Sequence, residues 1–419
     1  MSRRPEPRLS PGRLTAGRAL LDAERGGHLD EALEAGGVEE RPLANHLAYG
    51  VCRRRGALDL ALAAVADRPL QRLDAPVLVA LRIGAFERLF SRTPDHAAVG
   101  EAVELCRALG APHASGFVNA LLRRVAAPTE ELPRWVNHPA WWAERWRARI
   151  GDEALGAWCL RESEPPPLGV IVRDGDGAGF AARLTAEGLT VRPAVAGGVE
   201  VPGALCVAPP FGRVEGLPGF EAGEFWVMDP AAAAIADLLG AGPGQRVLDA
   251  CAAPGGKTLR LLAAGAEVLA TDKKVNRLAR MAESLGRVGL SAETRRVDWE
   301  AADPGVTETF DAALVDAPCT GLGTMRRHPE VRWSRGAGDP AAMSLHQRVI
   351  LKNVAARVKP GGVLVYAVCS PEPEEGEAVV RAFLQSAPEW SLDSTLSFAP
   401  PEDEDAHFAA RMTRAPNAV

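Results

Sequence analysis

The chain has 419 residues, 47% of them hydrophobic, and a formal net charge of −6. This size and composition predict a globular protein with about two or three domains, and no apolar run reaches the roughly 18 residues of a membrane span. The net charge argues weakly against a general nucleic-acid binder. Residues 1–150, however, contain 22 Arg, no Lys and 18 acidic residues, so this net +4 part could still guide a polyanion.

The first residues of the chain and its cysteines favour a cytoplasmic protein. Residues 1–12 are rich in Arg and Pro and lack the apolar stretch of a signal peptide, so we expect a flexible tail. The seven cysteines form no CxxC pair and no zinc spacing, and their odd number does not suit a disulfide framework. We therefore expect a cytoplasmic monomer without a metal site.

Residues 13–126 are predicted to form an all-helical domain. Apolar residues recur three and four positions apart in residues 58–65 and 77–90, and residues 116–124 are expected to form another helix. The turn Thr93-Pro94-Asp95 separates two of these helices.

Residues 134–228 are predicted to form a small α+β linker domain. It begins with a connector broken by prolines that contains Trp141, Trp142 and Trp146. Packing of these rings between helices is favoured over stacking on nucleic-acid bases. Short strands are expected at residues 168–173 and 190–193, around a helix at 179–187.

Residues 229–414 alternate strands with helices, which predicts a doubly wound, mostly parallel α/β sheet. Strands are expected at residues 246–250, 267–272, 294–298, 310–316 and 363–368, and helices at 258–264, 275–288 and 341–358. Pro360-Gly361-Gly362 is interpreted as a turn into the last strand.

Two cysteines lie at the ends of two of these strands. Cys319 stands in Asp316-Ala317-Pro318-Cys319, and Cys369 closes the apolar run of residues 363–368. Because ligands bind in the crevice at the carboxyl ends of such strands, the two thiols are expected to face the same crevice. This arrangement suggests covalent thiol chemistry.

The loop from Cys251 to Thr258 has two interpretations. Gly255 and Gly256 allow a ligand close to a helix N-terminus, and the loop nearly matches the phosphate-binding loop of an NTPase, with Asp316 as a magnesium-holding acid. Against this, Cys251 replaces the first glycine of that motif, and Pro254 removes an N–H group. A nucleoside pocket is the alternative, in which Asp272 accepts from ribose hydroxyls and Asp298 from an adenine amino group.

Three motifs carry a resemblance. Cys251-Ala252-Ala253-Pro254-Gly255-Gly256-Lys257-Thr258, the run from Asp316 through Arg326-Arg327-His328-Pro329-Glu330-Val331-Arg332-Trp333, and Tyr366-Ala367-Val368-Cys369-Ser370 resemble RNA cytosine-C5 methyltransferases of the Nop/Sun type. The helical N-terminal region is similar to the NusB-like domain of the bacterial small-subunit rRNA methyltransferase B branch. The resemblance implies a Rossmann-like methyltransferase domain that uses S-adenosylmethionine, and 16S rRNA as the substrate.

The resemblance also implies roles for residues. Cys369 is expected to attack cytosine C6 and Cys319 to take part in release, while Asp316 contacts the base and Lys257 lies between cofactor and base. The expected cofactor-binding residues are Cys251, Ala252, Ala253, Pro254, Gly255, Gly256, Lys257, Asp272, Asp298 and Asp316. Arg326, Arg327 and His328 are expected to contact RNA, although an arginine pair that only faces solvent is equally compatible with the sequence.

The chain departs from the family pattern beside the expected nucleophile and along the cofactor wall. Val368 stands where the family commonly has Thr, and Gly376 replaces the Asn of a Glu-Asn-Glu triplet. Met228 and Ala232 replace a Gln and a Ser, so activity and affinity could be weaker than usual. An NTPase, and a non-catalytic RNA-binding assembly factor built on the same folds, remain the alternatives.

Overall fold

The computed structural model describes residues 9–37, 40–129, 131–398 and 404–417, which divide into two compact units. The first unit contains the chain up to Glu164 and the segment Met325–Gly336, and the second contains Pro165–Thr324 and the chain from Ala337 onward. Most of the predicted tail, residues 1–8, lies outside the described residues. The prediction is wrong at the end of the tail, because a helix begins at Pro11 with the Ser10 side chain accepting from the N–H of Arg13.

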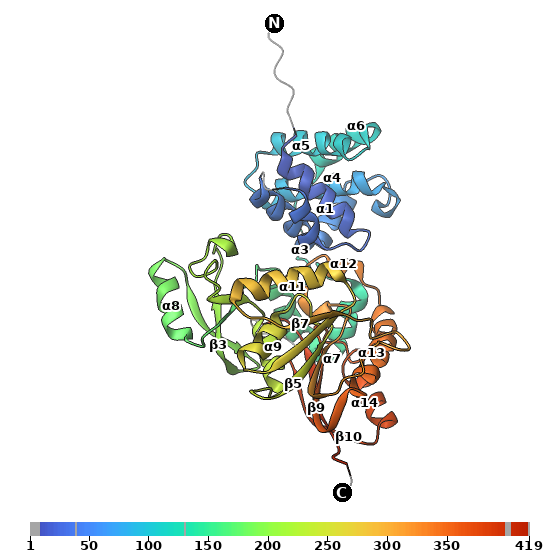
Figure 1. The fold of residues 1–419 in the computed structure, drawn as a ribbon. Helices are drawn as coiled ribbons and strands as arrows, with labels where there is room; N and C mark the ends of the chain where they lie inside the picture. Colours follow the sequence, from blue (N-terminus) through green and yellow to red (C-terminus); the bar gives the residue numbers. More distant parts are fainter. Residues whose placement is uncertain (1–8, 38–39, 130, 399–403, 418–419) are drawn as a thin grey trace. The chain divides into compact units, whose positions relative to one another are not determined.

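The first unit is helical, which confirms the helical character predicted for the N-terminal part of the chain (Figure 1). Its helices are α1 (Pro11–Ala23), α2 (Leu29–Ala35), α3 (Arg41–Ala63), α4 (Ala75–Phe90), α5 (Asp95–Ala108), α6 (Ser115–Arg124), α7 (Ala140–Glu162) and α12 (Val331–Ser334). Helix α4 is apolar on nearly all sides, and its neighbours cover it, with Leu47, Leu81 and Leu122 in one buried core.

The tryptophan-rich connector is helical rather than broken. Helix α7 runs across it and kinks at Gly151, whose φ is +80°. Trp142 and Trp146 are buried, and the ring of Trp158 lies 5.1 and 4.9 Å from theirs between ring centroids. These rings pack as a cluster in edge-to-face geometry, so packing is the confirmed interpretation for Trp142 and Trp146.

The second unit begins with a small antiparallel sheet in the order β2-β3-β1-β4, covered by α8. Its elements are β1 (Leu168–Val172), α8 (Gly177–Ala186), β2 (Val191–Ala196), β3 (Val199–Val207) and β4 (Phe225–Val227). Strands β3 and β4 were not predicted. The predicted strands β1 and β2 and the predicted helix are present with shifted ends.

The large sheet of the second unit has the order β10-β11-β9-β8-β5-β6-β7. Its strands are β5 (Arg246–Ala250), β6 (Glu267–Asp272), β7 (Glu293–Arg296), β8 (Phe310–Asp316), β9 (Val358–Val368), β10 (Trp390–Ser397) and β11 (Phe408–Arg414). The five strands β5 to β9 are parallel to one another, and β11 and β10 add an antiparallel edge beside β9, so the mostly parallel doubly wound sheet is confirmed.

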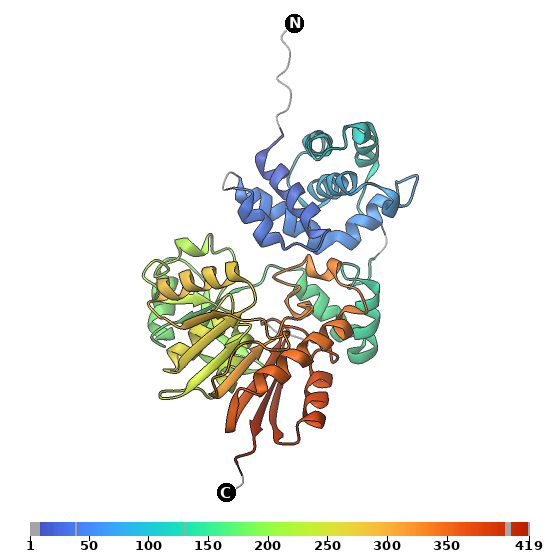
Figure 2. The ribbon, with the colours of Figure 1, turned by 45° about the vertical axis from the view of Figure 1, so that its right-hand side comes forward.

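Helices cover both faces of this sheet, because successive residues of its strands point to opposite sides. On β5, Val247 belongs to the core under α9 (Pro230–Leu238), α10 (Gly256–Ala263) and α11 (Val275–Val288), while Leu248 belongs to the core under α13 (Asp339–Ala355) and α14 (Glu377–Ser386). Figure 2 shows these two groups of helices, yellow and orange to red, on opposite sides of the strands.

Two further predictions are wrong. Pro360-Gly361-Gly362 is an irregular part of β9 and not a turn before it, because the strand register shifts here and Gly361 has a φ of +78°. Asp298 lies two residues beyond β7, which ends at Arg296.

Among the described residues, no helix combines the length and the apolarity that crossing a membrane requires.

Candidate active site

The site lies where β5, β8 and β9 end side by side. These three parallel strands are neighbours in the sheet, so the segments that follow Ala250, Asp316 and Val368 emerge at one edge. The segment after β5 leads into α10, and the segments after β8 and β9 each carry one of the two predicted thiols.

The two thiols meet as the sequence predicted. Cys319 Sγ and Cys369 Sγ lie 3.3 Å apart, and both cysteines are free and half-buried. The hydrogen bond to Cys369, followed by burial and by the nearby charge of Glu375, raises the pKa of Cys319 well above its usual value. Cys319 is therefore a thiol near neutral pH, and its S–H can donate to a Cys369 thiolate.

Lys257 and Asp316 form an ion pair beside these thiols. Lys257 Nζ lies 2.8 Å from Asp316 Oδ2, and the two side chains are 11% and 33% exposed. Burial alone would lower the pKa of Lys257, but the charge of Asp316 and its hydrogen bond outweigh burial and raise that pKa overall. A negative charge on Cys369 would raise the pKa of Lys257 further.

A buried carboxyl group supports the start of α10. Asp249 is fully buried on β5 and accepts a hydrogen bond of 2.6 Å from the Thr258 hydroxyl. Burial raises the pKa of Asp249 to about 7. Cys251, two residues later, has a φ of +65°, and burial raises the pKa of its thiol. Cys251 is therefore a poor nucleophile.

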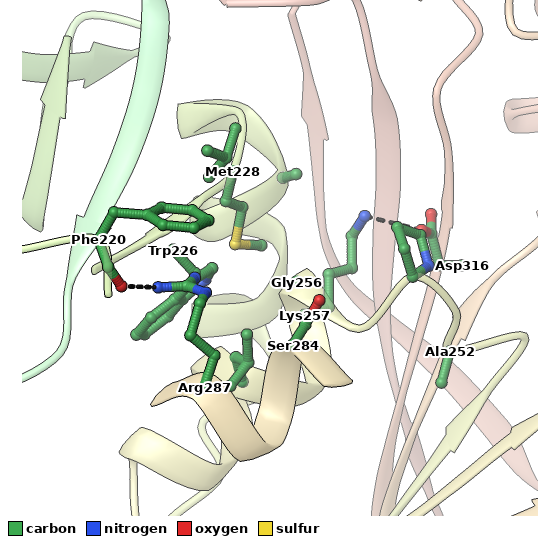
Figure 3. Close-up of a pocket in the computed structure, with 13 residues that line it drawn as sticks. Phe220, Trp226, Met228, Ala252, Gly256, Lys257, Ser284, Arg287 and Asp316 are labelled. Atoms are coloured by element: carbon green, nitrogen blue, oxygen red, sulfur yellow. Dashed lines mark hydrogen bonds and ion pairs between the residues drawn. The ribbon is translucent and has the colours of Figure 1, made fainter. Parts of the chain in front are cut away.

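A cavity of about 370 Å³ opens beside the ion pair (Figure 3). Gly255, with a φ of +104°, is the N-cap of α10, and a Cβ there would lie 2.5 Å from Met281 Cγ, so only glycine suits this turn. Aromatic, sulfur-bearing and loop residues all contribute to the lining of the cavity. It comprises Phe220, Trp226, Val227, Met228, Ala232, Ala252, Pro254, Gly256, Lys257, Leu259, Ser284, Arg287 and Asp316.

Five of the ten predicted cofactor residues line this cavity, namely Ala252, Pro254, Gly256, Lys257 and Asp316. Cys251, Ala253 and Gly255 belong to the same loop but are not part of the lining. Asp272 and Asp298 are also outside it. Asp272 is buried, accepts from the N–H of Lys274 at 2.8 Å and lies 3.6 Å from the Arg277 guanidinium, while Asp298 pairs with Lys273 at 2.9 Å.

Of the wall opposite the loop, the sequence indicated Met228 and Ala232 but not Phe220, Trp226 or Arg287. Phe220 and Trp226 come from the segment around β4, far upstream of the three motifs, and Arg287 comes from α11. The Arg287 guanidinium donates to the backbone carbonyls of Phe220 and Phe225, at 2.7 and 3.0 Å, and lies over the Phe220 ring. Figure 3 shows Phe220, Met228 and Arg287 together on this side, with Lys257 directed at Asp316.

The residues that differ from the family pattern lie in or near the site. Met228 and Ala232 both line the cavity, and Val368 is fully buried in β9. Gly376 lies against Phe408, since a Cβ at this position would approach the ring Cγ to 2.8 Å. The Gly376 and Phe408 pair explains why a larger residue is absent here.

The predicted RNA-contacting residues are half-buried in the first unit. Arg326 donates from Nε to the carbonyl of Glu164 at 3.3 Å, and its own carbonyl accepts from Arg53 at 3.2 Å. The same segment continues to Arg332, which is fully buried and donates to the carbonyl of Met325 at 2.8 Å. Contacts of Arg326, Arg327 and His328 with RNA stay a prediction.

The chain matches two family models. Residues 236–416 match the family described as 16S rRNA methyltransferase RsmB/F, and residues 12–127 match the NusB family. Among curated proteins, ribosomal RNA small subunit methyltransferase B of Pseudomonas putida is 35% identical, with 91% of this chain and 89% of that protein covered. The protein of the same name from Xylella fastidiosa is 38% identical over 83% and 82% of the two chains.

Solved structures agree in fold. The crystal structure of PH0851 is 25% identical with a TM-score of 0.80, covering 95% of this chain and 98% of that chain. The structure of NSun6 from Pyrococcus horikoshii with SFG has a TM-score of 0.58 at 19% identity and covers 67% of this chain and 99% of that one. The predicted fold class and resemblance are confirmed, and these matches favour a methyltransferase over an NTPase. The chain belongs to the RsmB/F family of 16S rRNA methyltransferases.

Proposed function

We propose that this protein methylates C5 of a cytosine in RNA, with 16S rRNA as the substrate, through a covalent bond between Cys369 and C6 of the base. The observation that carries the proposal is the 3.3 Å approach of Cys319 and Cys369 beside the Lys257–Asp316 ion pair. This arrangement supplies one nucleophile, one thiol donor and one charged pair around a single reacting base.

S-adenosylmethionine is the cofactor, and the residues of the cavity fit it. The volume of about 370 Å³ lies in the range of small-ligand sites. The side of the cavity formed by Phe220, Trp226 and Met228 suits a flat apolar ring, and Gly256 leaves its wall open at the N-terminus of α10. When bound, the cofactor supplies an electrophilic methyl group. The roles of Asp272 for ribose and Asp298 for adenine remain part of the proposal.

The chemistry of cytosine requires the thiol. C5 is a poor nucleophile, and addition of a Cys369 thiolate to C6 forms an S–C6 bond and places an electron pair at C5, which can then take the methyl group. Afterwards the C5 proton leaves, and its electron pair expels the Cys369 thiolate as the S–C6 bond breaks. The 3.3 Å distance between Cys319 and Cys369 supports a role for Cys319 in this release.

The ion pair serves the same base. Asp316 is partly exposed towards the cavity and can hydrogen-bond the N3 or amino edge of cytosine, which favours charge on the ring as the adduct forms. Lys257 holds the Asp316 carboxylate in place at 2.8 Å and keeps a positive charge near Cys369.

The other parts of the proposal concern the whole chain. We assign residues 13–126 to a NusB-like RNA-binding domain, 134–228 to a linker domain and 229–414 to the methyltransferase domain. Arg326, Arg327 and His328 contact the substrate RNA, whose target base must leave the stack to reach the thiol. The protein acts as a cytoplasmic monomer.

Transfer of labelled methyl from S-adenosylmethionine to unmodified small-subunit rRNA tests the proposal, with nuclease digestion to identify the product. Wild type is expected to form 5-methylcytidine, and Cys369→Ala to form none. Cys319→Ala is expected to slow release more than attack, so a protein–RNA adduct should accumulate. If Cys369→Ala accumulates the adduct instead, the two roles are reversed. If wild type binds cofactor and RNA without transfer, the enzyme proposal fails for this RNA.

A further inference from the structure

A buried carboxylate lies behind the two thiols. Glu375 follows β9, six residues after Cys369, and is 0% exposed. Its Oε1 accepts from the Thr320 N–H at 2.8 Å and from Gln347 Nε2 at 3.0 Å, and its Oε2 accepts from the Ser370 hydroxyl at 2.6 Å and the Thr320 hydroxyl at 2.5 Å. Both oxygens are thus fully engaged.

This hydrogen-bond set indicates the ionised form. A carboxylate offers about four lone-pair positions, and here four donors from three side chains and one backbone amide occupy them. Burial raises the pKa of Glu375 overall, and the hydrogen bonds oppose that change without cancelling it. Among the residues that the structure describes, no Lys, Arg or His lies within ion-pair distance of Glu375, so neutral donors alone hold its charge.

The donors come from the two segments that carry the thiols. Thr320 directly follows Cys319, and Ser370 directly follows Cys369, so one carboxylate ties the two segments together. Gln347 adds a second link, because its amide also donates to the carbonyl of Pro318 at 3.0 Å. The Glu375 backbone is itself fixed by the Tyr366 hydroxyl, which donates to its carbonyl at 2.6 Å.

We propose that Glu375 is a positioning residue for methyl transfer, whose carboxylate holds the segments after β8 and β9 together and so keeps the Cys319 and Cys369 thiols in contact. This inference rests on the proposed roles of the two cysteines. It goes beyond them, because Glu375 touches neither sulfur through a hydrogen bond in the structure and acts through Thr320 and Ser370.

The charge of Glu375 has a second consequence. It contributes to the raised pKa of Cys319, after the hydrogen bond to Cys369 and burial. A neutral residue at position 375 would therefore ease ionisation of Cys319 and weaken its ability to donate its S–H to Cys369. Placement and protonation of Cys319 thus depend on the same carboxylate.

Glu375→Gln is the most direct test of the carboxylate. It keeps the size of the side chain but replaces one acceptor oxygen with an NH2 group, which cannot accept the hydrogen bonds that the oxygen accepted. Glu377→Gln is the matched control, since Glu377 is exposed in the first turn of α14 and lies two residues away. Ser370→Ala is a milder variant that removes one donor from the Cys369 side and leaves the carboxylate in place.

The first measurement needs no RNA. Dibromobimane alkylates two nearby thiols, each sulfur displacing one bromide, and peptide mapping identifies a Cys319–Cys369 bridge. Wild type and Glu377→Gln are expected to form the bridge, Ser370→Ala to form less, and Glu375→Gln to form least, roughly tenfold less than wild type, because the released segments no longer hold both sulfurs within the span of one probe molecule. An unchanged bridge in folded Glu375→Gln would overturn the proposal.

The second measurement is steady-state methyl transfer to unmodified small-subunit rRNA. Glu375→Gln is expected to lower kcat roughly 100-fold with KM for S-adenosylmethionine unchanged, and Ser370→Ala to lower kcat less. Unchanged kcat, or a KM effect alone, would contradict the proposal. Inactive wild type would count against the proposed function, whereas the bridge would still decide whether Glu375 positions the thiols.

Discussion

Gly323 donates its backbone N–H to the carbonyl oxygen of Cys369 over 3.0 Å, which connects the segment after β8 directly to the segment after β9. The Gly323 carbonyl in turn accepts the N–H of Ala406 at 3.0 Å. A Cβ at position 323 would lie 1.8 Å from the Ala406 oxygen and 2.9 Å from the Cys369 oxygen. The backbone around Cys369 therefore requires glycine at position 323.

Gly323→Ala is expected to destabilise the protein by about 1–3 kcal/mol, because the backbone must shift to admit the methyl group. Methyl transfer should fall more steeply than stability, since the shift moves the Cys369 carbonyl. Urea unfolding and methyl-transfer assays test both. Gly286→Ala is the control, because this exposed helical position has free space and the change should stabilise by roughly 0.5–1 kcal/mol.

Asp272→Asn tests the ribose assignment. The substitution preserves the size of the side chain and an oxygen for the Lys274 N–H, but it removes the charge that faces Arg277. We expect calorimetric affinity for S-adenosylmethionine to fall about tenfold or more, because an acceptor for both ribose hydroxyls is lost. Asp298→Asn tests the adenine assignment in the same titration. An unchanged affinity in the Asp272 variant would refute the ribose role and would fit its position outside the cavity lining.

Three central strands of the sheet could be predicted. Strands β5, β6 and β8 have the predicted bounds, because their continuous apolar runs reflect cover by helices on either side. The edge strand β10 was missed, since most of its side chains face solvent and its sequence lacks apolar alternation. Helix α7 was missed for two reasons. The proline just before its first turn was interpreted as a break in the connector, and the kink at Gly151 interrupts the helical periodicity of the apolar residues.

The part of the site that lies within the three sequence motifs was predicted. Cys319, Cys369, Lys257 and Asp316 come together because the ends of β5, β8 and β9, and the segments that follow them, meet at one edge of the sheet. The hydrogen bonds of Glu375 could not be predicted, since its partners come from separate segments whose meeting depends on the fold. The aromatic wall of Phe220 and Trp226 could not be predicted either, because these residues lie outside the motifs and only the fold brings them to the loop from Cys251 to Thr258.

Arg332→Met is expected to destabilise the first unit by about 3–5 kcal/mol, because a buried ion pair is broken on one side only. Arg332 is fully buried and lies 3.5 Å from Glu162, which also contacts His138 at 2.7 Å. Urea unfolding measures the loss, and Arg72→Met at an exposed position is the control. The double variant Arg332→Met with Glu162→Gln should lose less than the two single losses added together. Simple additivity would show that the pair is not coupled.

The same network predicts a pH effect on the Arg332 variant. Burial lowers the pKa of His138, and the Arg332 charge lowers it further, although Glu162 opposes both. Removing Arg332 allows His138 to bind a proton more readily and to pair with Glu162. The destabilisation by Arg332→Met should therefore be smaller at pH 5.5 than at pH 8, as measured by urea unfolding at the two pH values. A loss that is equal at both would exclude compensation by His138.

Asp249→Asn is expected to stabilise the protein at neutral and higher pH. Burial raises the pKa of Asp249 to about 7 from an ordinary value of 3.8, so the folded chain binds this proton more tightly than the unfolded chain does. The contribution of the protonated carboxyl is fully present below pH 3.8 and is lost as pH rises through about 7. An asparagine never ionises and avoids the loss, whose upper bound is roughly 4 kcal/mol at pH 8.

The advantage of Asp249→Asn over wild type should therefore grow between pH 5 and pH 8 in urea unfolding. The Thr258 hydroxyl can still donate to the amide oxygen, so the start of α10 should keep its structure. Thr258→Val is the companion variant, because it removes the donor that favours the ionised carboxylate and should leave wild-type Asp249 still harder to ionise. A difference between Asp249→Asn and wild type that stays constant over this range would show that Asp249 does not titrate there.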